Sequence, residues 1–289
     1  MRRGVALRRI RELCGPQQPQ PTAVTPLLEP LAGVRAVLLD VYGTLFVSAP
    51  AGARGPDGPL AEAFAALGLP LPAALVETAE GLLEAIIGEH QDRARAGGAE
   101  PPEIDIVAVF RELLRRLASA AALPLPRDRG TAERLALEQE LRRNRVWPMP
   151  GAAAALAGLR DRGLPLGIVS NSQFYTPWLF PALLGGSLST LGFRRALCSW
   201  SYRFLCAKPS PRLFQRPLRW LRRRGIPPEA VLMVGNDFGR DLLPASHLGC
   251  RTALFAGDAR SYKPASGPDA AGRPDALLTA LAQLPGIVR

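Results

Sequence analysis

The chain has 289 residues, 47% of them hydrophobic and 21% charged, which is enough for one large globular unit or two modest ones. The sequence lacks a run of about 18 apolar residues, so we expect no membrane span. Four scattered cysteines and two histidines argue against a zinc site and for a reduced, cytoplasmic protein.

The formal net charge of +11 comes almost entirely from arginine. The arginines are scattered through helical stretches and lack the interleaved aromatic residues of a single-strand platform, which argues against nucleic-acid binding. Only two of the 36 basic residues are lysines, Lys208 and Lys263. In a chain where arginine is the prevailing cation, the retained Lys208 indicates a position that needs a compact ammonium.

In chain order, residues 1–33 come first, a basic, proline-rich segment that we expect to be a loosely ordered extension. The apolar run from Ala36 to Leu39 then leads directly into Asp40, Gly43 and Thr44. This pattern is typical of a buried parallel strand that delivers a carboxylate to the edge of a sheet. Gly43 permits a sharp turn, whose amides and threonine hydroxyl could face an anion.

Residues 48–147 predict a second, smaller unit. Proline and glycine between residues 48 and 58 indicate a linker, and residues 59–146 have the apolar spacing of helices. The two flanking segments, 34–47 and 148–289, alternate strand and helix patterns, with further strands predicted near 164–171, 196–200, 230–237 and 251–255. This alternation predicts an α/β fold, a parallel sheet with helices on both faces.

Polar residues end several of these predicted strands. They are Ser170 and Asn171 after the second strand, Lys208 in a loop after the third, and Asn236, Asp237 and Asp241 after the fourth. Ligands of open parallel sheets bind outside the carboxyl ends of the strands, so these groups and Asp40 are candidates for one site. Hydroxyl and amide groups suit substrate oxygens, and carboxylates suit a hard cation.

The motifs resemble those of the haloacid dehalogenase superfamily of hydrolases. The stretch Asp40-Val-Tyr-Gly-Thr-Leu45 is similar to its first motif, Ser170-Asn171 to the second, Lys208-Pro209 to the third, and Gly235-Asn-Asp237 with Asp241 to the fourth. The resemblance implies a Rossmann-like core with an inserted helical cap, and Asp40 as a nucleophile that forms a covalent aspartyl intermediate. It also implies catalytic roles for Lys208 and the residue at Tyr42, and substrate contacts from Thr44, Ser170 and Asn171.

Tyr42 leaves the reaction open. Most phosphatases of this superfamily carry a second aspartate at that position, whereas tyrosine resembles the 2-haloacid dehalogenase branch. A phosphate monoester is nearly a dianion, and each unit of like charge at ~4 Å from Asp40 costs about 4 kcal/mol at an effective dielectric of about 20. Attack therefore needs a cation, which Asp40, the Tyr42 carbonyl, Asp237 and Asp241 could hold as Mg²⁺.

We therefore favour a Mg²⁺-dependent phosphatase of a small, anionic organic substrate. The alternatives are a metal-independent 2-haloacid dehalogenase and a protein that keeps the fold but only binds a ligand. The aromatic stretch from Phe174 to Trp178 follows the second motif, so it could contact the organic part of a substrate or anchor the next helix. Both interpretations stay open at this point.

Overall fold

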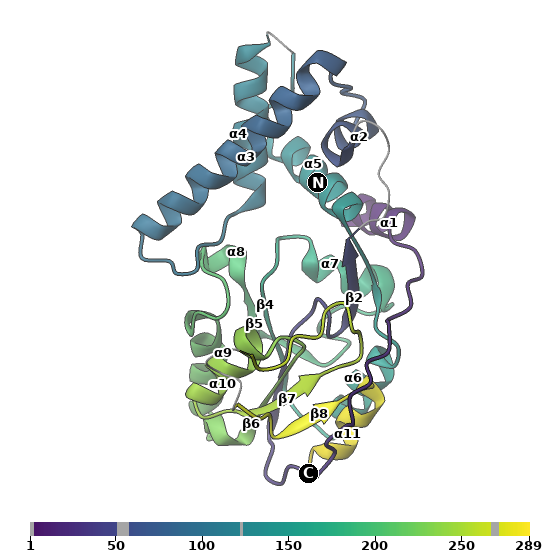
Figure 1. Cartoon of the computed structure of the whole chain (residues 1–289), viewed down its shortest axis with the longest axis vertical. Coiled ribbons are helices and arrows are strands. Elements are labelled where there is room, and N and C mark those ends of the chain that lie inside the picture. Colours follow the sequence, from purple (N-terminus) through teal and green to yellow (C-terminus); the bar gives the residue numbers. More distant parts are fainter. Residues whose placement is uncertain (1–2, 51–57, 122–123, 267–271) are drawn as a thin grey trace.

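The computed structural model describes residues 3–50, 58–121, 124–266 and 272–289. Its centre is a six-stranded sheet in which all neighbouring strands are parallel (Figure 1). The predicted α/β fold is therefore confirmed. In spatial order the strands are β5 (Phe193–Trp200), β4 (Leu166–Ser170), β1 (Ala36–Leu39), β6 (Val231–Gly235), β7 (Arg251–Phe255) and β8 (Ala276–Leu278).

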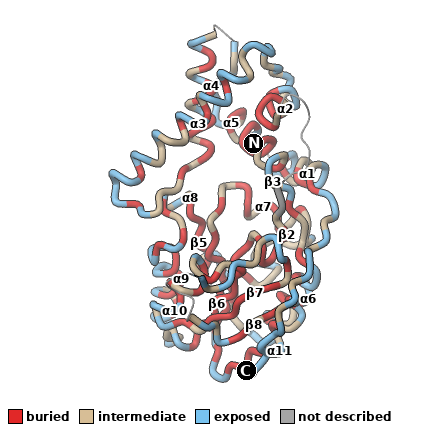
Figure 2. The backbone as a smooth tube through the Cα atoms, viewed as in Figure 1, coloured by how far each residue is buried: buried red, intermediate tan, exposed pale blue. Residues whose placement is uncertain are grey.

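Both faces of β1 are buried. Val37 and Leu39 belong to one apolar cluster, whereas Ala36 and Leu38 belong to a second cluster on the other face. In Figure 2 the strands at the centre of the core are largely red, the colour of buried residues. This is why the strand is a continuous apolar run and not an alternating one. The helices of this core are α6 (Ala152–Asp161), α7 (Thr176–Leu183), α8 (Ser201–Phe204), α9 (Arg212–Arg222), the π-helix η2 (Phe238–Leu242), α10 (Leu243–His247) and α11 (Leu284–Ile287), with short 3₁₀ turns at Pro228–Ala230 and Leu281–Gln283.

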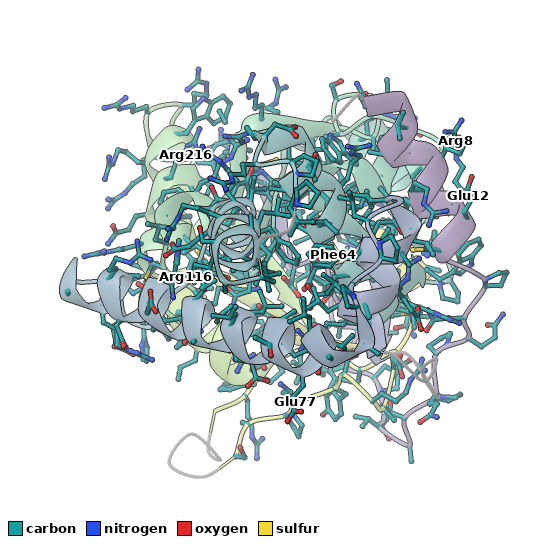
Figure 3. The ribbon with its side chains drawn as sticks, turned by 90° about the horizontal axis from the view of Figure 1, so that it is seen from above. Arg8, Glu12, Phe64, Glu77, Arg116 and Arg216 are labelled. Carbon is teal, nitrogen blue, oxygen red and sulfur yellow. The ribbon has the colours of Figure 1, made fainter. Side chains whose placement is uncertain are left out.

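Four helices form a separate body above the sheet, which we call the helical unit (Figure 1). They are α2 (Gly58–Ala66), α3 (Ala73–Ala96), α4 (Ile106–Ala120) and α5 (Arg129–Arg143). Phe64, Ile86 and Phe110 lie in an apolar cluster of their own, so the unit buries its own core. Figure 3 looks onto this unit from above, with α3 extended across it. The described residues include no helix with the length and apolar character of a membrane span.

The helical unit is joined to the core through a pair of antiparallel strands, β2 (Phe46–Pro50) and β3 (Asn144–Pro148). The sequence predicted a linker and a helix here, and most of that linker, residues 51–57, lies outside the described residues. The unit touches the core again through the α3–α4 connection. There the Glu103 N–H donates to the Leu205 carbonyl at 2.9 Å, and the Ala207 N–H donates to the Pro101 carbonyl at 2.9 Å.

The N-terminal segment differs from the loosely ordered extension that we expected. Helix α1 (Arg3–Leu13) buries Ala6 and Ile10 completely and packs against both α5 and α7. The guanidinium of Arg9 makes two hydrogen bonds, 2.6 and 2.7 Å long, to the carboxylate of Glu138 in α5. Further along, Leu27 pairs with Leu277 beside β8. The few apolar residues that α1 buries give no clear pattern in the sequence, so this packing could not be predicted without knowing the helices that α1 contacts.

Candidate active site

Asp40 directly follows the central strand β1. Its backbone N–H donates to the carbonyl oxygen of Val234 in β6 at 2.9 Å, which carries the ladder to the strand's end. The residue is 6% exposed. Its carboxylate is therefore positioned by the sheet itself, between the ends of β4 and β6, and only a small part of it meets solvent.

The turn after Asp40 is pressed against the fourth motif. Gly43 has a φ of +82°, and a Cβ there would lie 2.7 Å from Nδ2 of Asn236, so no larger residue fits. The Thr44 hydroxyl donates to Oδ1 of Asn236 at 3.1 Å, and Nδ2 of Asn236 donates to the Ser261 carbonyl at 2.7 Å. Thr44 is fully buried, and its hydroxyl faces Asn236. The predicted substrate-binding threonine thus ties the first motif to the fourth.

Lys208 lies at the centre of the site. Its ammonium donates to Oδ1 of Asp40 at 2.7 Å, to the Val169 carbonyl at 3.1 Å and to Oδ1 of Asp241. Burial alone would lower the pKa of Lys208, but the two carboxylates outweigh it and raise that pKa above its ordinary value. The lysine therefore stays charged although it is only 4% exposed. Three acceptors around one nitrogen explain why a compact ammonium stands here and not a guanidinium.

Asn171 holds the lysine in place through the backbone. Its Oδ1 accepts from the Lys208 N–H at 2.7 Å, and its Nδ2 donates to the Lys208 carbonyl at 3.4 Å. Ser170 is fully buried at the end of β4, and its hydroxyl makes only a long contact of 3.5 Å with the Asn171 carbonyl. The second motif thus positions the third, and in this structure the Ser170 side chain is not part of the cavity surface.

Asp241 is the second anchor of Lys208. It lies in η2, 1% exposed, and its Oδ2 accepts from the Asp237 N–H at 3.1 Å. Burial raises the pKa of Asp241, and the nearby charge of Asp40 adds to this, while Lys208 opposes both. A Cβ on Gly235 would lie 2.3 Å from Oδ2 of Asp241, so this close packing requires glycine at the end of β6.

Asp237 faces the opening of the site. Its Oδ1 accepts from the Arg240 N–H at 2.9 Å, and its Oδ2 lies 3.3 Å from the ammonium of Lys263. Lys263 is held beside the fourth motif because its N–H donates to the Asn236 carbonyl at 2.9 Å. Both lysines of the chain therefore lie at this site. Lys263 was not among the predicted site residues, although the scarcity of lysine in the chain is a signal that could have identified it.

The hydroxyl of Tyr42 is engaged by Thr176 of α7. The Tyr42 and Thr176 hydroxyl oxygens are 2.9 Å apart. Burial raises the pKa of Tyr42 well above its ordinary value, although the hydrogen bond to Thr176 acts against this. Such a phenol is a weak proton donor at neutral pH, so it does not substitute for a carboxylic acid.

One cavity of about 290 Å³ brings the predicted residues together. Asp40, Tyr42, Asn171, Lys208, Asp237 and Asp241 line it, together with Ser48, Asn236, Arg240 and Lys263. Thr44 and Ser170 do not. The aromatic stretch of residues 174–178 is absent from this lining: Phe174 stacks edge to face on Tyr175 and on Trp178, with ring centres 5.6 and 5.4 Å apart. Its role as an anchor for α7 is the one that its contacts support.

The residues suit a hard cation only in part. No group of three or more Asp, Glu, His or Cys side chains in the described segments has the arrangement of a metal site. Both oxygens of Asp241 already accept hydrogen bonds, from Lys208 and from the Asp237 N–H. Asp40, Asp237 and the Tyr42 backbone carbonyl are the other oxygen donors, and of these Asp237 already meets the Arg240 N–H and the exposed Lys263 ammonium. One or two carboxylates completed by water and substrate oxygens are the usual surroundings of Mg²⁺ in proteins.

A parallel sheet that presents a lysine-paired aspartate at the end of its central strand, inside an open cavity, defines an enzyme of the α/β class. Comparison with protein families specifies which one. Residues 34–249 match the model of the haloacid dehalogenase-like hydrolases, and the chain belongs to this family of hydrolases. The family resemblance seen in the four motifs is therefore confirmed.

Two curated relatives are phosphatases. The chain is 32% identical over 111 residues to glyceraldehyde 3-phosphate phosphatase of Methanothermobacter thermautotrophicus, a match that covers 37% of this chain and 44% of that protein. It is 32% identical over 162 residues to phosphoserine phosphatase of Thermus thermophilus, covering 56% of this chain and 58% of that protein. The chain thus spans about half the length of the curated relatives that it matches.

The structure is also similar to a solved dehalogenase. The 2-haloacid dehalogenase from Pseudomonas syringae pv. Tomato superposes with a TM-score of 0.54 at 21% identity, over 88% of this chain and 97% of that chain. At this identity the likeness shows a common fold and no more.

Proposed function

We propose that this hydrolase is a Mg²⁺-dependent phosphatase of a small organic phosphate, with Asp40 as the nucleophile and the helical unit as a cap over the site. The observation that carries the proposal is the buried group of Asp40, Lys208 and Asp241, in which two carboxylates share one ammonium. With both carboxylates ionised, this group has a net charge of −1. A phosphate dianion approaching Asp40 would be repelled unless a further cation were present.

Asp237 supports the choice of a phosphate substrate. Its carboxylate lines the same cavity and is partly accessible, with a side-chain exposure of 15%. Its pairing with the exposed ammonium of Lys263 at 3.3 Å offsets only part of its charge, so a bound cation would further reduce the repulsion toward an anionic substrate. Asp40, Asp237 and the Tyr42 carbonyl would hold Mg²⁺, which when bound would offset the charge of the phosphoryl oxygens.

In the proposed reaction, a carboxylate oxygen of Asp40 attacks phosphorus, the ester P–O bond breaks and an aspartyl phosphate forms. Lys208 holds the Asp40 carboxylate in orientation and neutralises part of the charge that gathers on the phosphoryl group. Water then attacks the same phosphorus, releases inorganic phosphate and restores the carboxylate. Asn171 acts as a positioning residue because it fixes the backbone of Lys208.

Tyr42 limits which leaving groups the proposed reaction can expel. With its hydroxyl against Thr176 and its pKa raised by burial, it is a poor acid for the departing alkoxide. We therefore infer a preference for esters whose alcohol is a good leaving group, such as phenols, enols or acyl phosphates. The same lack of a base should slow hydrolysis of the aspartyl phosphate, so this intermediate should accumulate.

The test is phosphate release from aryl and alkyl esters, measured with Mg²⁺ and again after chelation with EDTA. We expect turnover of p-nitrophenyl phosphate with Mg²⁺, much slower turnover of alkyl esters, and a phosphoryl adduct on Asp40 in acid-quenched samples analysed by mass spectrometry. Asp40→Asn should remove both turnover and adduct while leaving the circular dichroism spectrum unchanged. Turnover that persists in Asp40→Asn would refute Asp40 as the nucleophile.

The dehalogenase alternative has one observation in its favour, since Tyr42 and Lys208 line the cavity with Asp40 and no group of three or more Asp, Glu, His or Cys side chains among the described residues is arranged to hold a metal ion. In that reaction Asp40 would displace halide from carbon, and no metal would be needed. Halide release from 2-chloropropionate in the presence of EDTA, with no phosphate release from any ester in Mg²⁺, would replace the phosphatase proposal.

A further inference from the structure

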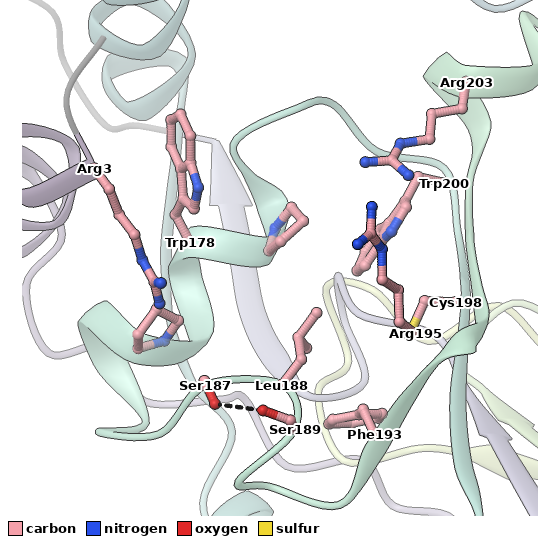
Figure 4. A pocket seen from close by; sticks show the side chains of 12 residues that line it. Arg3, Trp178, Ser187, Leu188, Ser189, Phe193, Arg195, Cys198, Trp200 and Arg203 are labelled. Carbon is pink, nitrogen blue, oxygen red and sulfur yellow. Dashed lines mark hydrogen bonds between the residues drawn. The ribbon is translucent and has the colours of Figure 1, made fainter.

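A second cavity opens on the outer side of the core, beside the edge strand β5 and helix α7. Its volume is about 400 Å³, and it shares no residue with the active-site cavity. Figure 4 shows Trp178 and Arg3 along one side, with Trp200, Arg195 and Arg203 along the other. We call it the indole cavity, after Trp178 and Trp200.

The indole cavity is positively charged. Among the described residues, three arginines line it and no aspartate or glutamate does. Within the described residues Arg3 and Arg195 have no acidic partner, and Arg203 donates only to the neighbouring Tyr202 hydroxyl, at 3.0 Å. Three guanidinium groups at the mouth of a hollow fit phosphate or carboxylate oxygens, which they bind through paired N–H donors.

The walls of the cavity are aromatic. Trp200 is only 3% exposed. Trp178 is half-buried across the cavity, and Phe193 and Leu188 complete the apolar surface. Two indoles facing a hollow favour a flat, aromatic ligand, since aromatic rings stack on the faces of tryptophan.

We propose that the indole cavity is a binding site for a mononucleotide, with the base packed against Trp178 and Trp200 and the phosphate held by Arg195 and Arg203. The volume falls within the range of small-ligand sites and is too small for a nucleic-acid chain. Charge and aromatic surface together select this ligand class. An inorganic anion would pair with the arginines but could not stack on the indoles, and an uncharged aromatic compound would stack on the indoles but could not pair with the arginines. The proposal does not depend on the reaction at Asp40.

The cavity lies close to the second motif. Trp200 is the register partner of Ser170 across β4 and β5, and the next residue, Ser201, accepts from the Ser172 N–H at 2.8 Å. A nucleotide on Trp200 would therefore lie one strand away from the segment that positions Lys208. Tryptophan fluorescence is thus a direct readout, since two of the four tryptophans of the chain line the cavity.

The experiment titrates the full-length Asp40→Asn protein with AMP, so that bound nucleotide is not hydrolysed, and follows tryptophan fluorescence. We expect saturable quenching by AMP, with adenosine and inorganic phosphate each at least about tenfold weaker, because each lacks half of the recognised chemistry. The absence of saturable quenching would overturn the proposal. Phosphate binding as tightly as AMP would overturn it too, since the indoles would then play no part.

Paired variants locate the site. The double variant Arg195→Gln with Arg203→Gln should lower the affinity for AMP by about tenfold or more, which is the loss expected for charge-assisted hydrogen bonds. Arg222→Gln with Arg223→Gln removes the same charge from exposed positions on and just after α9, and should leave the affinity nearly unchanged. An equal loss of AMP affinity in the two double variants would show that only the net charge of the protein matters, and it would overturn the proposed site. Thermal melting of each variant checks that the fold is retained.

Discussion

Replacing Lys208 with methionine tests the electrostatic arrangement of the site. The substitution keeps most of the side-chain volume but leaves the Asp40 and Asp241 carboxylates buried without their cation. At the 2.7 Å separation of Lys208 and Asp40, opposite charges attract by about 6 kcal/mol at an effective dielectric of about 20. Desolvation of the ammonium offsets part of this, and removal of one partner from a buried pair costs about 3–5 kcal/mol in practice.

We therefore expect Lys208→Met to lower the free energy of unfolding by about 3–5 kcal/mol, measured by urea denaturation at neutral pH. Part of the loss should disappear as the pH falls, because a buried carboxylate without its cation can take up a proton. Adding Asp241→Asn to Lys208→Met should also recover part of the stability, since one uncompensated charge is then gone. Activity should not recover in either case.

The other lysine of the chain provides the control. Lys263 is 58% exposed at its side chain, so Lys263→Met should change the stability by less than about 1 kcal/mol. This electrostatic role of Lys208 is refuted if Lys208→Met and Lys263→Met unfold at the same urea concentration. It is refuted as well if the double variant of Lys208 and Asp241 is no more stable than Lys208→Met alone.

Three further outcomes follow from the contacts. Gly235→Ala should destabilise the fold by about 1–3 kcal/mol in urea, because its Cβ would overlap a buried carboxylate, whereas Gly88→Ala in α3 has open space and should be neutral or stabilising. Lys263→Gln should raise the KM for a phosphate ester by about fivefold without lowering kcat, while Lys263→Arg should restore the KM, since the exposed cation acts on substrate charge. Glu138→Gln should release the N-terminal helix that Arg9 holds, seen as faster amide hydrogen exchange in α1 and unchanged exchange in β1.

The parts of the fold that could be predicted are those that a local pattern specifies. The predicted apolar runs matched β1, β4, β6 and β7 nearly to the residue, because strands buried on both faces leave a continuous apolar signal. The parallel arrangement followed from the alternation with helices. Strand β8, only Ala276–Leu278, has no such signal, since three residues next to β7 are held by their neighbour rather than by their own pattern.

The role of each residue within the site could not be predicted from the sequence. Asp237 and Asp241 are both acidic residues of one motif, and only the π-helix between them turns Asp241 inward to Lys208 while Asp237 faces the opening. Thr44 carries the hydroxyl of a predicted anion-binding turn, yet its partner Asn236 comes from a segment far along the chain. Spacing in the sequence indicates which residues share a site, but side-chain direction depends on packing between segments.

The attachments of the helical unit bear on which substrates the site can admit. Besides β2 and β3, the unit is held by the α3–α4 connection on residues 205–207 and by α1, which packs on α5 and on α7. Burial opposes ionisation of Glu138, but the bonds from Arg9 and Arg142 outweigh it and lower its pKa, so the α1 contact holds at neutral pH and weakens only in acid. Within the described residues the active-site cavity is lined by the core and by Ser48 of β2, with no side chain from α2 to α5. A tethered unit that lines none of this cavity of about 290 Å³ leaves selection at the phosphoryl end of the proposed substrate to the size of the cavity, which is near the lower limit for ligand sites, while the leaving group would extend outside it.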